Sequence, residues 1–304
     1  MNIASACAKT ILFGEHAVVY GESAIAIPLS NIRTTAEINP NGDEFRVVSE
    51  NTGMDLPYRK LEPGSGIREL LTKIKSIAEF DELPADTLSI CTEIPIASGL
   101  GSGAALSIAI LRVFSSYYNL KLSNKEINEI AYEIEKIYHG APSGIDNTVI
   151  AYEQPLIFSK KQGSSILSAD MSKFHLLVID SGIRSKTIDV VSDVRYNFEK
   201  NKIYIHEIGK LTVSAIPALE SGDVAQVGLL MSENQRLLQK INVSCKELDE
   251  LLLLAHSEGV PGCKLTGAGR GGNFLVLAKD KTQALYMKKI YNDLGLRVYY
   301  DHPS

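Results

Sequence analysis

The sequence predicts an α+β fold divided into two domains. Its 304 residues are enough for one large domain or two of ordinary size. The polar stretch at 160–165 interrupts the hydrophobic periodicity, and an apolar, strand-like run follows at 174–180. Beyond it, long helical patterns are combined with short strand patterns, which is typical of α+β layers. We therefore expect one domain over residues 1–165 and a second over residues 166–304.

The first expected domain contains a strand followed by two helices. Residues 85–94 alternate apolar and polar side chains, which predicts a strand that is buried on one face. A helical pattern then runs from Ser102 to Tyr118. Ser123 and Glu126 have the spacing of a capping box, so a second helix is expected to begin there.

The second expected domain is richer in helix. Helical patterns fill most of residues 189–241, and Ser244 and Glu247 form another capping-box pattern before an apolar helix. A strand, a helix and a strand are expected at the C-terminal end, over 273–279, 282–295 and 296–300.

Charge and composition restrict the classes of partner. The formal net charge is −5 with acidic and basic residues interspersed, so the broad basic face that nucleic acid requires is not expected. No segment has the apolar length of a membrane span, and charged residues interrupt the first twenty positions, where a signal peptide needs an apolar core. The four cysteines form no CxxC pair, which favours free thiols over zinc or disulfides. We expect a cytoplasmic protein that acts on a small molecule, with neither a nucleic acid nor a membrane as partner.

The stretch PIASGLGSGAA, at 95–105, places three glycines and two serines between the expected strand and helix. It has neither the spacing of a Walker loop nor that of a dinucleotide-binding fingerprint. Glycines allow backbone N–H groups to approach an anion, Ser98 and Ser102 add hydroxyl donors, and the following helix offers its positive end. On this stretch alone, a phosphate-binding loop and a simple connection between strand and helix are both open.

Two further glycine-containing clusters lie far away in the sequence. The segment AKTILFGEHAVVYG, at 8–21, places Lys9, Glu15 and His16 around an apolar strand and a glycine turn. The segment KLTGAGRGG, at 264–272, has four glycines in six residues, and close approach of a ligand would explain so much backbone freedom. Taken singly, Lys9 could be a surface lysine and His16 a hydrogen-bonded structural histidine.

A fourth cluster combines two carboxylates. In HGAPSGIDN, at 139–147, Asp146 follows a Pro-Ser-Gly turn. Glu135 lies on the flank of the apolar stripe of the preceding helix, one turn before His139. Together with the two glycine-containing clusters, this segment strengthens the phosphate-binding interpretation.

These four segments resemble the motifs of the GHMP kinase superfamily, in the expected order along residues 8–272. GEHAVVYG is most similar to the mevalonate kinase version of the first motif, PIASGLGSGAA and KLTGAGRGG resemble the second and third, and HGAPSGIDN resembles the segment with the catalytic aspartate. The resemblance implies an N-terminal α/β domain like domain 2 of ribosomal protein S5 and a ferredoxin-like α+β C-terminal domain. It also implies ATP-dependent phosphorylation of the 5-hydroxyl of mevalonate in isoprenoid biosynthesis, with Mg²⁺ as cofactor. A homodimer is one assembly that the resemblance allows.

Matched position by position, the resemblance implies roles in catalysis. Asp146 would accept or orient the proton of the substrate hydroxyl, and Lys9 beside it would keep the carboxylate ionised. Glu135 matches the family's Mg²⁺ carboxylate, and Ser102 could complete the metal site. Phosphoryl transfer depends mostly on positioning and charge neutralisation, so this division of roles is physically reasonable.

The resemblance also implies two binding surfaces. The residues expected to surround the ATP phosphates are Pro95, Ser98, Gly99, Leu100, Gly101, Ser102, Gly103 and Ala104. The residues expected to bind mevalonate or the transferred phosphoryl group are Glu15, His16, Thr266, Gly267, Ala268, Gly269 and Arg270.

Three positions depart from the family pattern. Gly103 stands where the family usually has a serine that binds Mg²⁺, so one side-chain ligand is missing. Arg270 replaces a usual glycine and Asn273 a usual cysteine, and Arg270 could pair with phosphate or the mevalonate carboxylate, or point to solvent. Two alternatives stay open: a GHMP kinase of another small alcohol, such as a sugar or phosphomevalonate, and a catalytically silent paralogue that binds ligand. Retention of Lys9, Glu135 and Asp146 together favours an active kinase.

Overall fold

The computed structural model describes residues 1–40, 42–95, 98–139, 142–161 and 163–302. Within this part, the chain divides into two compact units. Unit 1 comprises Met1–Lys9 and Ile32–Glu153, and unit 2 comprises Thr10–Asn31 and Gln154–Ser304. Some residues of the segments singled out in the sequence lie outside the described residues: Ile96 and Ala97 of the glycine-rich stretch, Gly140 and Ala141 of the aspartate segment, and Gln162 of the polar break.

This division differs from the expected boundary at residue 165. The chain passes from unit 1 to unit 2 after Glu153, and an N-terminal piece also belongs to unit 2. The long strand β2 (Ala24–Pro40) explains this, because Ala24–Ala26 pair with β6 (Leu156–Ser159), whereas Thr34–Pro40 pair with β5 (Asp86–Thr92). Local hydrophobic periodicity does not show which strands pair when they are so far apart in the sequence.

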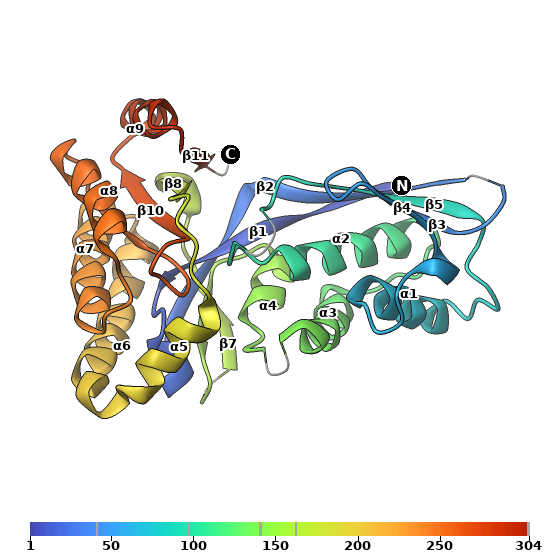
Figure 1. The fold of residues 1–304 in the computed structure, drawn as a ribbon, viewed down its shortest axis with the longest axis horizontal. Coiled ribbons are helices and arrows are strands. Elements are labelled where there is room, and N and C mark those ends of the chain that lie inside the picture. Colours follow the sequence, from blue (N-terminus) through green and yellow to red (C-terminus); the bar gives the residue numbers. More distant parts are fainter. Residues whose placement is uncertain (41, 96–97, 140–141, 162, 303–304) are drawn as a thin grey trace. The chain divides into compact units, whose positions relative to one another are not determined.

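Unit 1 packs helices against one face of a sheet (Figure 1). Here β5 pairs in antiparallel fashion with β2 and in parallel with β3, which is followed by β4. The strand β1 (Ile3–Phe13) also pairs with β2. The remaining elements of this unit are β3 (Arg46–Ser49), β4 (Met54–Pro57), α1 (Gly66–Ile77), α2 (Ser102–Tyr117), α3 (Asn124–His139) and α4 (Ile145–Tyr152), with a short 3-10 helix at Tyr58–Lys60.

Two of the sequence predictions for unit 1 are confirmed by the structure. The helix expected from Ser102 is found as α2, which ends at Tyr117 and buries Ala105, Ile108 and Phe114 among other residues. The capping box before α3 is confirmed: Ser123 Oγ accepts from the Glu126 backbone N–H at 3.3 Å, while the Glu126 carboxylate accepts from the Ser123 backbone N–H at 2.8 Å.

Unit 2 contains a four-stranded antiparallel sheet in the order β11-β8-β10-β9 within the described residues. Its core combines the buried faces of these strands with apolar residues of the helices. The pair β6 and β7 and the first residues of β2 also belong to this unit. Its elements are β7 (Gly163–Ile166), β8 (His175–Asp180), α5 (Thr187–Tyr196), α6 (Phe198–Ser221), α7 (Val224–Lys240), α8 (Lys246–Ser257), β9 (Gly262–Leu265), β10 (Asn273–Ala278), α9 (Lys281–Asp293) and β11 (Arg297–Asp301), with 3-10 helices at Ala17–Tyr20 and Met171–Lys173. The predicted α+β class is confirmed.

The capping box predicted at Ser244 is wrong. The helix α8 begins one residue later than that pattern requires, with Cys245 in the N-cap position and no side-chain cap. The Ser244 hydroxyl instead donates to Asp249 Oδ1 at 2.6 Å, and Gln235 donates to both side chains. With Asp249 and Gln235 as its hydrogen-bond partners, the Ser244 side chain does not cap the backbone N–H groups at the start of α8.

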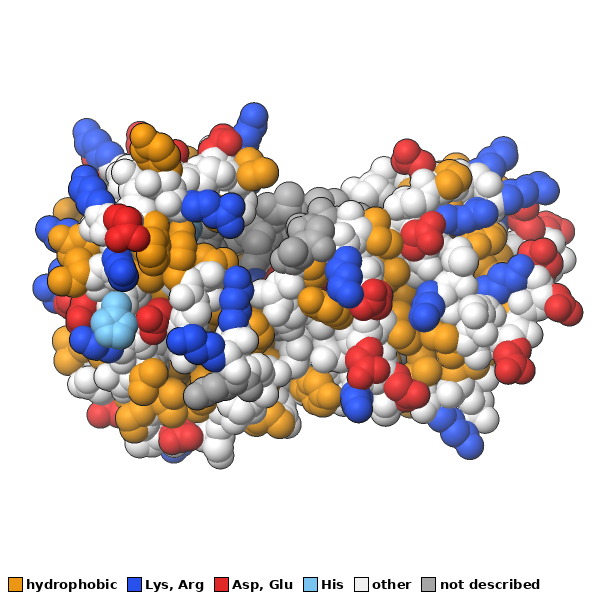
Figure 2. All heavy atoms as spheres, turned by 90° about the horizontal axis from the view of Figure 1, so that it is seen from below, with side chains coloured by type: hydrophobic (Ala, Val, Ile, Leu, Met, Phe, Trp, Pro, Cys, Tyr) orange, Lys and Arg blue, Asp and Glu red, His pale blue; other side chains and the backbone are white. Residues whose placement is uncertain are grey.

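Charged side chains of both signs are interspersed on the face of the molecule that Figure 2 shows. Hydrophobic side chains on the same face lie between them in small groups. Among the described residues, no helix combines the length and the apolar character that crossing a membrane would require.

Candidate active site

A lysine and an aspartate form an ion pair in unit 1. Lys9, on β1, donates to Asp146 Oδ1 at 2.9 Å. The Lys9 side chain is 6% exposed, whereas that of Asp146 is 33% exposed. Asp146 lies in the first turn of α4, where the positive end of the helix dipole favours a negative charge. The carboxylate is therefore paired with a cation while part of its surface remains accessible.

The position of Asp146 is fixed by hydrogen bonds at the start of α4. Gly144 is the N-cap residue and has φ +83°, a conformation that glycine adopts without strain. Thr148 Oγ1 donates to the Gly144 carbonyl at 2.6 Å, and Asn147 Nδ2 donates to Asn128 Oδ1 on α3, also at 2.6 Å. These contacts join the beginning of α4 to α3.

The glycine-rich stretch packs directly against Lys9. The Lys9 backbone N–H donates to the Leu100 carbonyl at 3.0 Å. Gly101 has φ +76°, and a β-carbon added there would lie 2.9 Å from Ile150 Cδ1 and 3.0 Å from Lys9 Cγ. Only glycine satisfies both the backbone angle and the close approach of the lysine stem.

The same stretch leaves the start of α2 open to an anion. Gly101 is the N-cap residue, no side chain caps the helix, and its first turn contains no acidic residue. The first N–H groups of a helix have no partner within the helix, and the helix dipole makes this end positive. Gly99 has φ +78°, and no atom of the described residues lies within 4 Å of the place of its missing β-carbon. The geometry is that of a phosphate-binding helix terminus.

A buried glutamate lies beside this helix terminus. Glu135, on α3, is 5% exposed, and a β-carbon added at Gly103 would lie 2.8 Å from its Oε1 atom. The carboxylate thus occupies the room that the glycine leaves. Ser102, the first residue of α2, adds a hydroxyl oxygen close in sequence. Oxygen donors of this kind suit Mg²⁺, which binds one or two protein carboxylates and keeps several waters. Among the described residues, no three or more His, Cys, Asp or Glu side chains cluster as metal ligands.

A second lysine–carboxylate pair lies in unit 2. Lys264, on β9, donates to Glu15 Oε1, and neither side chain has any exposed surface. The Lys264 ammonium also donates to the Leu265 carbonyl at 2.7 Å. Burial lowers the pKa of Lys264, and the negative charge of Glu15 opposes that shift.

His16 follows Glu15 and contacts the third motif. Its Nε2 atom is 2.8 Å from the Ala268 carbonyl oxygen, which can only accept, so Nε2 carries the proton. Burial lowers the pKa of His16; the hydrogen bond to Ala268 opposes this, and the positive charges of Arg270 and Lys264 lower it further. The imidazole is therefore neutral at pH 7, and its Nδ1 atom is a hydrogen-bond acceptor.

The third motif forms a loop in which all four glycines have positive φ. Gly267 and Gly269 have φ +81° and +85°, and a β-carbon at Gly269 would collide with the Val243 carbonyl oxygen. Before the loop, Thr266 Oγ1 lies 2.9 Å from Thr10 Oγ1 and donates to the Ile11 carbonyl at 2.9 Å. The loop is thus attached to the N-terminal segment of the same unit.

Arg270 uses its side chain within unit 2. Its Nε atom donates to the Asn242 carbonyl at 3.0 Å, and its guanidinium pairs with Asp193 on α5 at 2.5 Å. Arg270 also has φ +51°, an uncommon conformation for a residue with a side chain.

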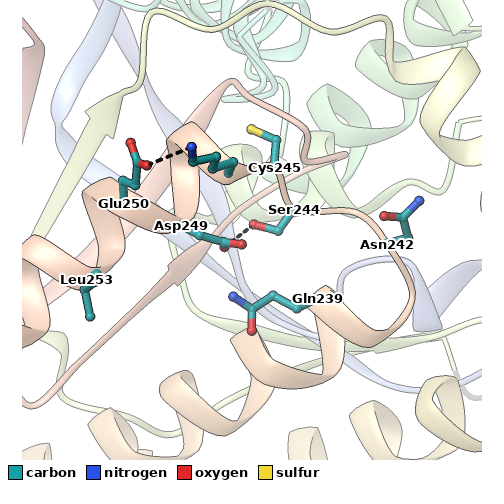
Figure 3. A pocket seen from close by; sticks show the side chains of 8 residues that line it. Gln239, Asn242, Ser244, Cys245, Asp249, Glu250 and Leu253 are labelled. Atoms are coloured by element: carbon teal, nitrogen blue, oxygen red, sulfur yellow. Dashed lines mark hydrogen bonds and ion pairs between the residues drawn. The ribbon is translucent and has the colours of Figure 1, made fainter.

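A pocket of about 500 Å³ lies where α7 is followed by α8, and Figure 3 shows its walls. None of the site residues predicted from the sequence lines it. Asn242, whose carbonyl oxygen accepts from Arg270, is the lining residue that joins it to the third motif. Its lining residues are Gln239, Asn242, Ser244, Cys245, Lys246, Asp249, Glu250 and Leu253.

The predicted site residues form two groups, one in each unit. In unit 1, contacts run from Asp146 through Lys9 to the glycine-rich stretch, and Gly103 adjoins Glu135. In unit 2, Glu15 and His16 are attached to β9 and the third-motif loop. Sequence reasoning assigned no role to Lys264 or Thr10. A lysine at the end of a short apolar run was the available signal for Lys264.

Comparisons with known proteins show the family of this chain. Residues 67–154 match the GHMP kinases N terminal domain, and residues 215–291 match the GHMP kinases C terminal domain. The mevalonate kinase of Thermococcus onnurineus is 35% identical over 92% of this chain and 90% of the relative, and that of Methanocaldococcus jannaschii is 30% identical over 96% of both chains. The crystal structure of the L. major mevalonate kinase in complex with R-mevalonate superimposes with a TM-score of 0.81 at 28% identity, covering 100% of this chain and 97% of that one.

Proposed function

Because this chain belongs to the GHMP kinase family, in its mevalonate kinase branch, we propose that it transfers the γ-phosphoryl group of ATP to the 5-hydroxyl of mevalonate. The observation that carries the proposal is the ion pair between Lys9 and Asp146, 2.9 Å long and partly exposed on the carboxylate side. A general base needs an accessible acceptor atom, and the exposed part of the Asp146 carboxylate supports that role.

In the proposed reaction, the substrate hydroxyl oxygen bonds to the γ-phosphorus of ATP while the bond to the bridging oxygen of ADP breaks. Asp146 accepts or orients the hydroxyl proton, and Lys9 keeps the carboxylate charged and offsets the negative charge near the attacking oxygen. The open N-terminus of α2 and the glycine-rich stretch bind the phosphates through backbone N–H groups.

Glu135 and Ser102 are the residues that we propose hold Mg²⁺. When bound, the ion neutralises phosphate charge and orients the transferred group. Glu135 supplies a carboxylate next to the helix terminus, and the missing side chain at Gly103 is compatible with waters as further ligands.

The residues of unit 2 are proposed to bind the alcohol substrate. The neutral His16 offers Nδ1 as an acceptor for a substrate hydroxyl, and the loop from Thr266 to Gly269 offers backbone N–H groups. The Glu15 carboxylate is enclosed with Lys264, so its proposed part is to hold the neighbouring His16 and not to contact the substrate. Direct contact of Arg270 with phosphate or with the substrate carboxylate stays a prediction.

The test is a coupled assay of ADP release in which mevalonate, phosphomevalonate, galactose and homoserine are compared as acceptors. We expect release that depends on mevalonate and exceeds the rate with the other three. A faster rate with another acceptor would identify a different GHMP kinase. No acceptor-dependent release with any of them would indicate the catalytically silent alternative.

A further inference from the structure

Lys264 is a fully buried cation that the proposed reaction does not use. Its ammonium has two acceptors, the Glu15 carboxylate and the Leu265 carbonyl oxygen. Removing two charged groups from water costs free energy, and apolar side chains of similar volume often stabilise such a position equally well. The pair therefore calls for an explanation other than stability alone.

The segment that carries Glu15 is tightly constrained on both sides. Gly14 precedes it with φ +94°, and a β-carbon there would lie 2.6 Å from Ala24 Cα. His16 follows with φ +60° and ψ −45°, a conformation that costs energy for a residue with a side chain. Such a conformation persists only where the surroundings determine it, and it is common in functional sites.

Three side-chain contacts join the first motif to β9 and the loop after it. Thr10 meets Thr266, Glu15 pairs with Lys264, and His16 Nε2 donates to Ala268.

Two of these contacts lie at neighbouring residues of the segment. The ion pair fixes the carboxylate at Glu15, and the next residue presents the imidazole. The Glu15 carbonyl also accepts from the Ala17 backbone N–H at 2.7 Å, which constrains the backbone at His16 between these two residues. A displacement of Glu15 would therefore also move His16.

We propose that Lys264 is a positioning residue: by fixing the Glu15 carboxylate, it holds the His16 imidazole in the orientation that receives the alcohol substrate. The inference rests on the proposed function, because it takes mevalonate as the ligand that contacts His16. Lys264 itself has no exposed surface and acts through its neighbour.

Two variants test this role. Lys264→Gln keeps Glu15 in place and supplies an uncharged donor. The double variant Glu15→Leu/Lys264→Met replaces the pair by apolar side chains of similar volume, so that neither charge is left buried alone. Each is compared with the wild-type enzyme for the midpoint of thermal unfolding and for the KM of mevalonate and of ATP.

We expect the double variant to unfold at or above the wild-type temperature, because the desolvation cost of the pair is gone. Its kcat/KM for mevalonate should fall on the order of 10²-fold, since a misplacement of about 1 Å has that effect. The KM for ATP should stay within about twofold. Lys264→Gln should also raise the KM for mevalonate, by a smaller factor than the double variant does.

The control is Gln235→Leu. The buried Gln235 side chain accepts from the Leu265 backbone N–H at 3.0 Å and does not contact Glu15, so the substitution removes a buried hydrogen bond without changing the ion pair. It should lower the unfolding temperature and leave the KM for mevalonate unchanged.

The positioning role is wrong if the folded double variant keeps a wild-type KM for mevalonate, or if the KM for ATP rises equally. A wild-type enzyme that releases no ADP with mevalonate would overturn both the proposed function and this inference. An active wild-type enzyme with an unaffected double variant would overturn this inference alone.

Discussion

The two lysine–carboxylate pairs have the same chemistry and different surroundings. In unit 1, Lys9 and Asp146 are 2.9 Å apart and one third of the aspartate side chain is exposed. In unit 2, Lys264 and Glu15 have no exposed side-chain surface, and burial lowers the pKa of the lysine. A carboxylate that reaches solvent can accept a proton from a ligand, whereas one that is fully enclosed can only hold its neighbours in place. Exposure, more than residue type, separates the two roles.

The largest effect on stability is expected from breaking the enclosed pair on one side. Lys264→Met leaves the Glu15 carboxylate buried without its cation, and removing one partner of a buried pair costs about 3–5 kcal/mol of folding free energy. Denaturant unfolding of the purified variant measures this. A free energy of unfolding within about 1 kcal/mol of wild type would show that water reaches Glu15 and that the contrast with unit 1 is false.

The corresponding change in unit 1 should affect turnover more than stability. In Lys9→Met, the partly exposed Asp146 stays hydrated, so the fold should persist, while kcat falls on the order of 10²-fold because the attacking oxygen loses its cation. The control is Lys136→Met, which removes the lysine of an exposed 2.6 Å pair with Glu133 and should change neither quantity. Equal kcat values in the two variants would remove Lys9 from the mechanism.

A smaller effect is expected at the proposed metal site. Glu135→Gln keeps the shape of the side chain and removes its charge, so the Mg²⁺ concentration for half-maximal rate should rise by about tenfold. Titration of the initial rate with Mg²⁺ at saturating ATP measures this. An unchanged titration curve would mean that Glu135 lies away from the ion.

The smallest effect is expected from Gly103→Ser. Gly103 lies within α2 and has no positive φ, so serine fits the backbone, and only the end of the Glu135 side chain must move to admit the new β-carbon. The enzyme should stay active with a half-saturating Mg²⁺ concentration lowered by about twofold.

Gly101→Ser is the matched control for that change. The same substitution two positions earlier meets φ +76° and the side chains of Ile150 and Lys9, so it should abolish activity. If Gly103→Ser is as inactive as this control, the first turn of α2 does not tolerate a side chain at position 103, and the argument about the missing Mg²⁺ ligand fails.

Local signals in the sequence were sufficient to predict several helices and strands. The helix from Ser102 and the capping box at Ser123 depend on neighbours within a few positions, and both are found. The capping box at Ser244 is not formed, because its side chain bonds to Asp249 and Gln235 instead, which spacing alone does not reveal.

The features that could not be predicted from the sequence depend on contacts between residues that are far apart along the chain. The assignment of Thr10–Asn31 to unit 2 depends on contacts with strands far along the chain. The enclosure of Glu15 depends likewise on Lys264, which is 249 positions away. Exposure is a property of the folded chain, and the difference between the two lysine–carboxylate pairs therefore appears only in three dimensions.

The most direct test of this difference compares the single-turnover rate of phosphoryl transfer in Asp146→Asn and Glu15→Gln at saturating ATP and mevalonate. The account predicts that Asp146→Asn loses on the order of 10²-fold or more in rate while its ATP affinity stays within about twofold. Glu15→Gln should transfer the phosphoryl group within about threefold of the wild-type rate and show its defect in the KM for mevalonate. A near-normal rate for Asp146→Asn, or an equal loss in both variants, would contradict the assignment of catalysis to the exposed pair.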